Sequence, residues 1–162
     1  MTTLSVVVIT LNEERRIAGC LAAVAWADEI VVVDSGSSDA TVAIARGQGA
    51  RVITRPFTTY AEQKNVALAA ATCDWSLSLD ADERVTPELA AEIRAAIAAP
   101  GDAAGFSVLR REHMLGQWID HGSWGPEHKL RLVRRGQGRW QGAVHETLHV
   151  DGGLLAGMNV MI

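Results

Sequence analysis

The sequence predicts an α/β protein with an open, mostly parallel sheet flanked by helices and a mixed or antiparallel C-terminal part. Short β-branched runs alternate with helical segments through the first two-thirds of the 162 residues, as in consecutive right-handed βαβ units. After residue 102 the apolar runs follow one another without helices, which favours antiparallel strands. The length predicts a single domain, because domains average about 150 residues, and 48% hydrophobic residues supply its core.

The first strand and helix show this pattern clearly. Residues 4–10 (LSVVVIT) form a continuous apolar run, as in a strand buried on both faces of a parallel sheet. A helix is expected next, with Asn12 as its N-cap and Glu13 in its positively polarised first turn. Apolar residues recur at i, i+4 and i+7 from Ile17 and form the buried stripe of that helix.

The same signals continue along the chain. Gly47 and Gly49 end the second helix, and Thr86 with Pro87 starts the fourth. In chain order, the later predicted elements are a strand at 29–34, a helix up to Gly47, a strand at 51–54, a helix at 60–71, a strand at 74–79, a helix at 87–98, and strands at 105–110, 129–134 and 143–150.

Charge is distributed unevenly along the chain. Residues 1–105 carry 8 Lys or Arg and 14 Asp or Glu, whereas residues 106–162 carry 7 and 5. This asymmetry favours an acidic half that holds a metal and a basic half that contacts an anionic partner, with ordinary solvated surface as the alternative. No nucleic-acid partner is expected.

The cysteines and the N-terminus indicate the compartment. Cys20 and Cys73 lie far apart without a second Cys or His at metal-ligand spacing, so we expect free thiols in a reducing cytoplasm. The first apolar run is short and lacks a basic leader, which predicts a strand rather than a signal peptide. No stretch reaches the ~20 apolar residues of a bilayer span. We expect a cytoplasmic protein, at most peripheral at the inner face of the membrane.

Polar residues follow three of the predicted parallel strands, at 10–13 (TLNE), 34–37 (DSGS) and 80–83 (DADE). In open α/β sheets, ligands bind beyond the carboxyl ends of the strands, near the point where the strand order reverses. These residues therefore predict a polar crevice at one edge of the sheet. Asp34 and Ser35 have an alternative role as turn formers and a helix cap.

Asp80 and Asp82 are candidates for a divalent metal. Carboxylate oxygens suit Mg²⁺ or Mn²⁺, which is usually held at a diphosphate by one or two carboxylates together with phosphate oxygens. The chain contains neither a Gly-x-Gly-x-x-Gly fingerprint after the first strand nor a P-loop motif. Phosphate is therefore expected to be bound by the metal and by Lys64, for which a solvated helix lysine is the alternative.

These segments resemble a known family. The order TLNEE, VVVDSGSSDAT and AEQKNVALAAATCDWSLSLDADERVTPEL is similar to the nucleotide-sugar half of the family 2 glycosyltransferases, inverting enzymes of GT-A fold. The stretches HGSWGPEHKLRLVRR and VHETLHVDG resemble the branch that acts in lipopolysaccharide inner-core synthesis, where a sugar is added to a heptose. The resemblance covers residues 4 to about 153.

The resemblance implies a single glycosyltransferase domain over 1–162, with a nucleotide-sugar-binding half at 1–100 and an acceptor half at 101–156. A sugar would pass from a nucleotide-diphosphate sugar to a saccharide or lipid-linked acceptor, with Mg²⁺ or Mn²⁺ as cofactor. Asp82 would bind the metal directly and Asp80 would lie by the ribose and the metal. The implied nucleotide-sugar-binding residues are Thr10, Asn12, Glu13, Asp34, Ser35, Lys64 and Asp80.

An inverting transfer needs a base opposite the leaving diphosphate. Glu146 is expected to be this base, because it ends a strand region in the acceptor half. Asp120 and Glu127 are rivals, and a structural His-Glu pair is the alternative for Glu146. The acceptor-side candidates are Trp124, Arg131 and His145.

Basic residues in the acceptor half offer a further surface. Lys129, Arg131, Arg134 and Arg135 alternate in part with apolar residues, which indicates either a strand with one solvated face or a platform for a phosphorylated saccharide or an anionic membrane.

The end of the sequence departs from the family. Residues 157–162 look unlike it, and the family's later histidine ligand is missing, so we expect a shortened acceptor half in which His145 or His149 substitutes as third metal ligand. Two alternatives stay open. One is a nucleotide-sugar-binding module without turnover, and the other is a nucleotidyltransferase that holds Mg²⁺ at a triphosphate through Asp80 and Asp82.

Overall fold

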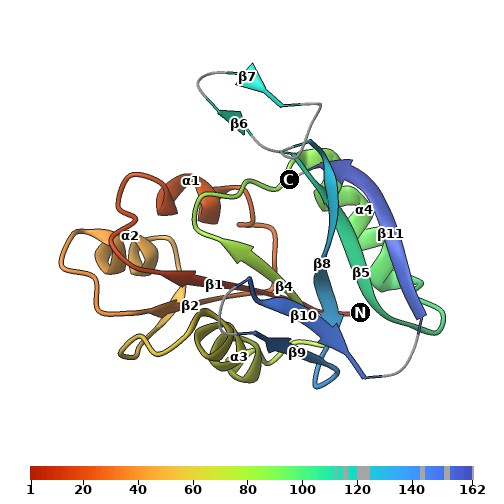
Figure 1. The fold of residues 1–162 in the computed structure, drawn as a ribbon, viewed down its shortest axis with the longest axis horizontal. Helices are drawn as coiled ribbons and strands as arrows, with labels where there is room; N and C mark the ends of the chain where they lie inside the picture. Colours follow the sequence, from red (N-terminus) through yellow and green to blue (C-terminus); the bar gives the residue numbers. More distant parts are fainter. Residues whose placement is uncertain (112, 115–116, 120–124, 143–144, 152–153, 162) are drawn as a thin grey trace.

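A computed structural model describes residues 1–111, 113–114, 117–119, 125–142, 145–151 and 154–161. Its main sheet has seven strands in the order β11-β5-β8-β4-β1-β2-β3 (Figure 1). The strands of the first half run parallel to one another; they are β1 (Leu4–Thr10), β2 (Glu29–Asp34), β3 (Arg51–Thr54) and β4 (Trp75–Asp80). The predicted open, mostly parallel sheet is thus confirmed.

The second half extends the same sheet beyond β4. Strand β8 (Glu127–Arg134) pairs antiparallel with both β4 and β5 (Ala103–Arg110). Strand β11 (Leu154–Met161) then adds to β5 in parallel and forms one edge. The predicted mixed character is confirmed, although no strand was expected at β11.

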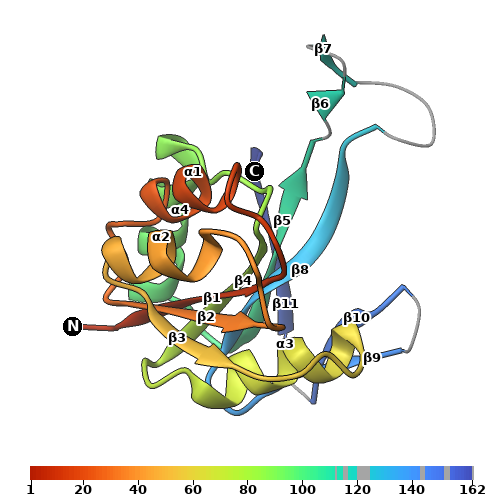
Figure 2. The same ribbon diagram turned by 90° about the vertical axis from the view of Figure 1, so that its left-hand side faces the viewer.

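Helices cover both faces of the sheet. Because successive strand residues point to opposite faces, Val6 and Val8 pack in one core with α1 and α4, whereas Val7 packs with α3 on the other side. Figure 2 shows α3 on the opposite side of the sheet from α1 and α2. The four helices are α1 (Ile17–Ala22), α2 (Thr41–Gly47), α3 (Tyr60–Ala70) and α4 (Pro87–Ala98).

The first helix begins later than predicted. Its N-cap is Arg16, and the expectation that Asn12 caps it is wrong. Asn12 adopts a left-handed backbone with φ 55°, which asparagine tolerates better than most residues. Its Oδ1 accepts a hydrogen bond from the Ser38 backbone N–H at 2.9 Å. Asn12 therefore ties the loop after β1 to the loop after β2.

Two small antiparallel sheets complete the fold, β6 (His113–Met114) with β7 (Gln117–Trp118), and β9 (Gly138–Gln141) with β10 (Thr147–Val150). Of the predicted strand at 143–150, the described residues 145–150 form a strand only at Thr147–Val150, and residues 143–144 lie outside the described residues; its partner β9 was not predicted. The β9–β10 hairpin packs against α3 (Figure 2). In the part of the chain that the structure describes, each helix is too short or too polar to cross a bilayer.

Glu29, at the start of β2, links three other segments of the chain through hydrogen bonds. Its carboxylate accepts hydrogen bonds from Ser5 Oγ, from the Arg51 guanidinium at 2.8 Å and from the Thr72 backbone N–H at 2.8 Å. Burial alone would raise the pKa of Glu29, but these hydrogen bonds outweigh it and lower the pKa from 4.5 to about 2. The charged form is therefore favoured in the folded protein.

We expect Glu29→Gln to lower the free energy of unfolding by about 1–2 kcal/mol at pH 7, because the charged acceptor is lost. The folded-state pKa is depressed, so this contribution is fully present above pH 4.5 and is lost as the pH falls toward 2. Urea denaturation of both proteins between pH 7 and pH 3 measures the difference. A difference that stays constant over this range would contradict the account.

Candidate functional site

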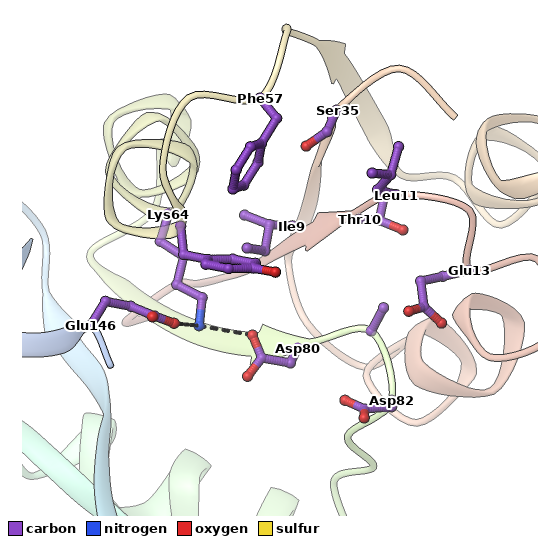
Figure 3. Close-up of a pocket in the computed structure, with 12 residues that line it drawn as sticks. Ile9, Thr10, Leu11, Glu13, Ser35, Phe57, Lys64, Asp80, Asp82 and Glu146 are labelled. Atoms are coloured by element: carbon purple, nitrogen blue, oxygen red, sulfur yellow. Dashed lines mark hydrogen bonds and ion pairs between the residues drawn. The ribbon is translucent and has the colours of Figure 1, made fainter. Parts of the chain in front are cut away.

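A cavity of about 440 Å³ lies at the carboxyl ends of β1, β2 and β4. The chain runs outward from β1 through β2 and β3 and then returns to β4 on the other side of β1, so the strand order reverses at this point. The volume is within the range of small-molecule sites, about 300–1,000 Å³. The cavity is lined by Ile9, Thr10, Leu11, Glu13, Ser35, Phe57, Tyr60, Lys64, Asp80, Ala81, Asp82 and Glu146 (Figure 3).

One end of the cavity offers hydroxyl groups beside apolar surface. Thr10 Oγ1 is buried and has no hydrogen-bond partner among the described residues. Ser35 Oγ accepts a hydrogen bond from Gln63 Nε2 at 2.9 Å, which leaves the Ser35 proton to donate elsewhere. Leu11 and Phe57 are about half exposed. This end suits a flat ring that carries polar groups at its edge.

The opposite end is charged, and Lys64 lies at its centre. Its Nζ is 2.8 Å from Asp80 Oδ1 and 2.9 Å from Glu146 Oε1 (Figure 3). Lys64 is buried, with 5% of its surface exposed, so the alternative of a solvated helix lysine is wrong. The ring of Trp140 lies 4.5 Å from Nζ. The ammonium is thus enclosed by two carboxylates and an aromatic face.

Arg131 pairs with two carboxylates behind this cluster, Asp80 and Glu83. Its Nη2 lies 3.3 Å from Asp80 Oδ2 and 2.9 Å from Glu83 Oε1, and the Asp80 backbone N–H donates to Glu83 Oε2. Burial alone would raise the pKa of Asp80, but the charges of Arg131 and Lys64 outweigh it and lower that pKa. For Glu83, burial and the charge of Asp80 prevail over Arg131 and raise the pKa.

Arg131 was predicted as an acceptor-side residue, but its side chain is buried and paired within the chain. Its neighbours on β8 are engaged as well. Lys129 pairs with Glu127, and Arg134 donates to the Ala103 carbonyl oxygen and lies over the Trp75 ring. The basic platform, which was one of two alternatives for these residues, is therefore largely occupied by contacts within the chain. Glu83 was not predicted as a site residue. A carboxylate three residues after Asp80 is nevertheless placed to accept the Asp80 backbone N–H in this turn, and this spacing was the available signal.

Asp34 lies beside the cavity but is not among its lining residues. It is buried, and its Oδ2 accepts the backbone N–H groups of Gly36 and Ser37, each at 2.9 Å. Gly36 has φ 100°, a conformation that favours glycine. The structure therefore shows Asp34 in its alternative role as a turn former. Asn12 likewise contacts a loop residue, Ser38.

Asp82 is exposed, lines the cavity and forms no hydrogen bond or ion pair with the described residues. Asp80 is already paired, and within the described ranges no three His, Cys, Asp or Glu side chains converge as a ready metal site. Neither His145 nor His149 lines the cavity, and His149 instead bonds Thr147 Oγ1 at 2.8 Å. The donor set fits a hard divalent cation that a ligand's oxygens help to hold.

The three candidate bases are placed differently. Glu146 enters the cavity from the side opposite Thr10 and Glu13 (Figure 3). Glu127 is exposed and lies away from the cavity, where Lys129 lowers its pKa. Asp120, like the acceptor-side candidate Trp124, lies outside the described residues. The predicted residues that the cavity brings together are Thr10, Glu13, Ser35, Lys64, Asp80, Asp82 and Glu146.

The sequence matches the family described as glycosyl transferase family 2 over residues 5–152. Lipopolysaccharide core biosynthesis glycosyltransferase LpsC of Rhizobium meliloti is 35% identical over 156 residues, covering 92% of this chain and 58% of LpsC. A TPR repeat-containing protein of Synechococcus elongatus is 39% identical over 160 residues, covering 96% of this chain and 37% of that protein. The chain thus spans less than two-thirds of the length of these relatives.

Solved structures share the fold. Glucosyl-3-phosphoglycerate synthase from M. tuberculosis, in complex with Mn²⁺, UDP and glucosyl-3-phosphoglycerate, matches with a TM-score of 0.58 and 25% identity over 68% of this chain and 44% of that chain. S. aureus TarS in complex with UDP-GlcNAc matches with a TM-score of 0.58 and 26% identity over 74% of this chain and 37% of that chain. The expected GT-A fold is confirmed.

Replacing Arg131 by leucine leaves Asp80 and Glu83 without their shared guanidinium. We expect Arg131→Leu to lower the free energy of unfolding by about 3–5 kcal/mol at pH 7, because a buried ion pair loses one partner. Arg139→Leu changes an exposed arginine on β9 and should cost less than about 0.5 kcal/mol. Urea denaturation compares the two variants. Unchanged stability in Arg131→Leu would favour the acceptor-side role instead.

Proposed function

The chain belongs to glycosyl transferase family 2, and we propose that it transfers a sugar from a nucleoside-diphosphate sugar to a hydroxyl of a saccharide acceptor, with inversion at the anomeric carbon. One observation carries the proposal. The cavity brings a hydroxyl-rich, partly apolar end, a lysine paired with Asp80 and Glu146, and the exposed carboxylate of Asp82 around one space. These are the groups needed to hold a nucleoside, a diphosphate and an attacking hydroxyl.

The donor would lie along the ends of β1, β2 and β4. The base and ribose suit the end formed by Leu11, Ser35 and Phe57, where Ser35 can donate a hydrogen bond. The diphosphate suits Lys64 and Asp82, the latter through a shared cation. A divalent cation bound there would neutralise negative charge on the leaving diphosphate. The neighbours in complex with Mn²⁺ and UDP, and with UDP-GlcNAc, support this arrangement.

Glu146 would act on the acceptor. As the acceptor oxygen bonds to the anomeric carbon, its proton passes to the Glu146 carboxylate and the bond from that carbon to the diphosphate oxygen breaks. Lys64 now pairs with Glu146. A diphosphate that attracts the Lys64 ammonium would release Glu146 from this ion pair, so its oxygen becomes available to the acceptor hydroxyl. Donor binding would thereby prepare the base.

The similarity to LpsC favours a lipopolysaccharide core saccharide as acceptor. We also place the reaction in the cytoplasm, at most at the inner face of the membrane. Cys20 and Cys73 are both free and buried, in keeping with a reducing compartment.

We expect Asp82→Ala to weaken the binding of UDP in the presence of Mn²⁺ by at least about tenfold, because a ligand of the shared cation is removed. Isothermal titration calorimetry with and without Mn²⁺ measures the effect. Asp102→Ala, which changes an exposed aspartate in the turn before β5, is the matched control and should bind as the unmodified chain does. Equal affinity in Asp82→Ala would exclude the metal role of this carboxylate.

We expect Glu146→Gln to lower kcat for sugar transfer by about 10²–10⁴ while UDP still binds, because the amide cannot accept the proton. The assay combines a panel of nucleoside-diphosphate sugars with deacylated lipopolysaccharide core oligosaccharide. Glu127→Gln tests the rival base and should keep its activity.

The same assay separates the alternatives. Nucleotide binding without transfer by the unmodified chain would identify a binding module, whereas release of pyrophosphate from a nucleoside triphosphate would identify a nucleotidyltransferase.

A further inference from the structure

We propose that Asn65 and Trp140 are positioning residues that hold Glu146 at the cavity by fastening the β9–β10 hairpin to α3. The inference rests on the proposed function in one respect, that Glu146 is the base. It concerns residues outside the cavity lining, which neither the sequence analysis nor the cavity geometry assigns to the reaction.

Asn65 bonds to β9 as a neighbouring strand would. Its Nδ2 donates to the Trp140 carbonyl oxygen at 2.9 Å, and its Oδ1 accepts the Trp140 backbone N–H at 2.8 Å. A primary amide supplies one donor and one acceptor in a plane, which matches both backbone groups of one strand residue. Because both groups face α3, they belong to the edge of β9 that does not bond to β10. Asn65 also follows Lys64 directly on α3, so the hairpin is fastened to the helix beside the lysine.

Trp140 makes a second contact, through the face of its ring. The side chain is buried and packs with Ala61 on α3 and with Leu148 on β10. Lys64 Nζ lies 4.5 Å and the Arg131 guanidinium carbon 5.7 Å from the ring centroid. Both cations also contact Asp80. The Trp140 Nε1 has no partner among the described residues, and the ring contacts both cations through its face.

Glu146 forms a further contact between the hairpin and α3. It lies in the connection from β9 to β10, directly after His145, whose φ of 58° is rare for a residue other than glycine. Such backbone strain persists where surrounding contacts fix the conformation. From this position the carboxylate reaches Lys64 at 2.9 Å. Two neighbouring residues of α3 thus hold the hairpin at both ends of the connection, at Trp140 and at Glu146.

The consequence of losing the Asn65 bonds is specific. The apolar cluster of Ala61, Val133, Trp140 and Leu148 still holds the hairpin, so the chain should fold and bind the donor. Once the donor has drawn Lys64 away from Glu146, the carboxylate of Glu146 would no longer be fixed relative to the cavity. Misplacement of a reacting group by about 1 Å can cost about 100-fold in rate.

The experiment compares Asn65→Ala with Trp140→Phe. Asn65→Ala should lower kcat by about 10–100-fold with unchanged affinity for UDP and Mn²⁺, and should speed amide hydrogen exchange in β9 and β10. Trp140→Phe keeps the backbone bonds but shortens the aromatic face over Lys64 and Arg131, so its loss of kcat should be smaller than that of Asn65→Ala. Ile93→Val, in the core on the other side of the sheet, controls for a general loss of stability and should leave kcat unchanged.

The outcomes separate this proposal from the function on which it rests. Faster exchange in Asn65→Ala with unchanged kcat overturns the positioning role and leaves the proposed function intact. A loss of UDP affinity in Asn65→Ala as large as its loss of kcat does the same. Loss of activity in Ile93→Val also overturns it, because general destabilisation then explains the effect. Absence of transfer by the unmodified chain overturns both proposals, whatever the exchange rates.

Discussion

The ammonium group of Lys64 lies between two carboxylates from distant parts of the chain, Asp80 at the end of β4 and Glu146 before β10. Little solvent reaches it, and a buried charge is costly unless it is paired. Without this cation the two carboxylates would face each other across the cavity with like charge. The pairing therefore holds together the strand ends of the first half and the hairpin of the second, and the rest of the site is arranged around it.

The charge asymmetry of the sequence acquires a structural meaning from this arrangement. The first half gathers carboxylates because parallel strands end at one edge of the sheet, and the second half returns a guanidinium to that edge. Arg131 on β8 meets Asp80 and Glu83 and is buried there. Part of the positive charge of the second half thus balances carboxylates of the first within the fold. Asp82 is left exposed at the cavity, where a cation and a diphosphate could be bound together.

Short apolar runs, rich in β-branched residues in β1 to β3 and in Trp and Leu in β4, made these strands predictable. Polar residues at their ends made Thr10, Ser35, Asp80 and Asp82 predictable as neighbours in one cavity. Local pattern left the turn-forming role of Asp34 as one alternative and did not show how Asn12 is used, because these side chains satisfy backbone groups of loops whose shape depends on tertiary contacts. Although a strand was expected across β10, the β9–β10 hairpin was not predicted, for a similar reason. Its strands are short and partly exposed, and its place is set by Asn65 and Trp140, which lie 75 residues apart.

The central claim is that a nucleoside diphosphate binds at Lys64 and takes this lysine from Glu146. A crystal structure of the chain with UDP and Mn²⁺, with manganese located by anomalous scattering, tests it directly. The account predicts manganese at the Asp82 carboxylate, a diphosphate oxygen within hydrogen-bond distance of Lys64 Nζ, and an open Lys64–Glu146 pair. A diphosphate bound away from Lys64, or a lysine that keeps both carboxylates while UDP is bound, would contradict it.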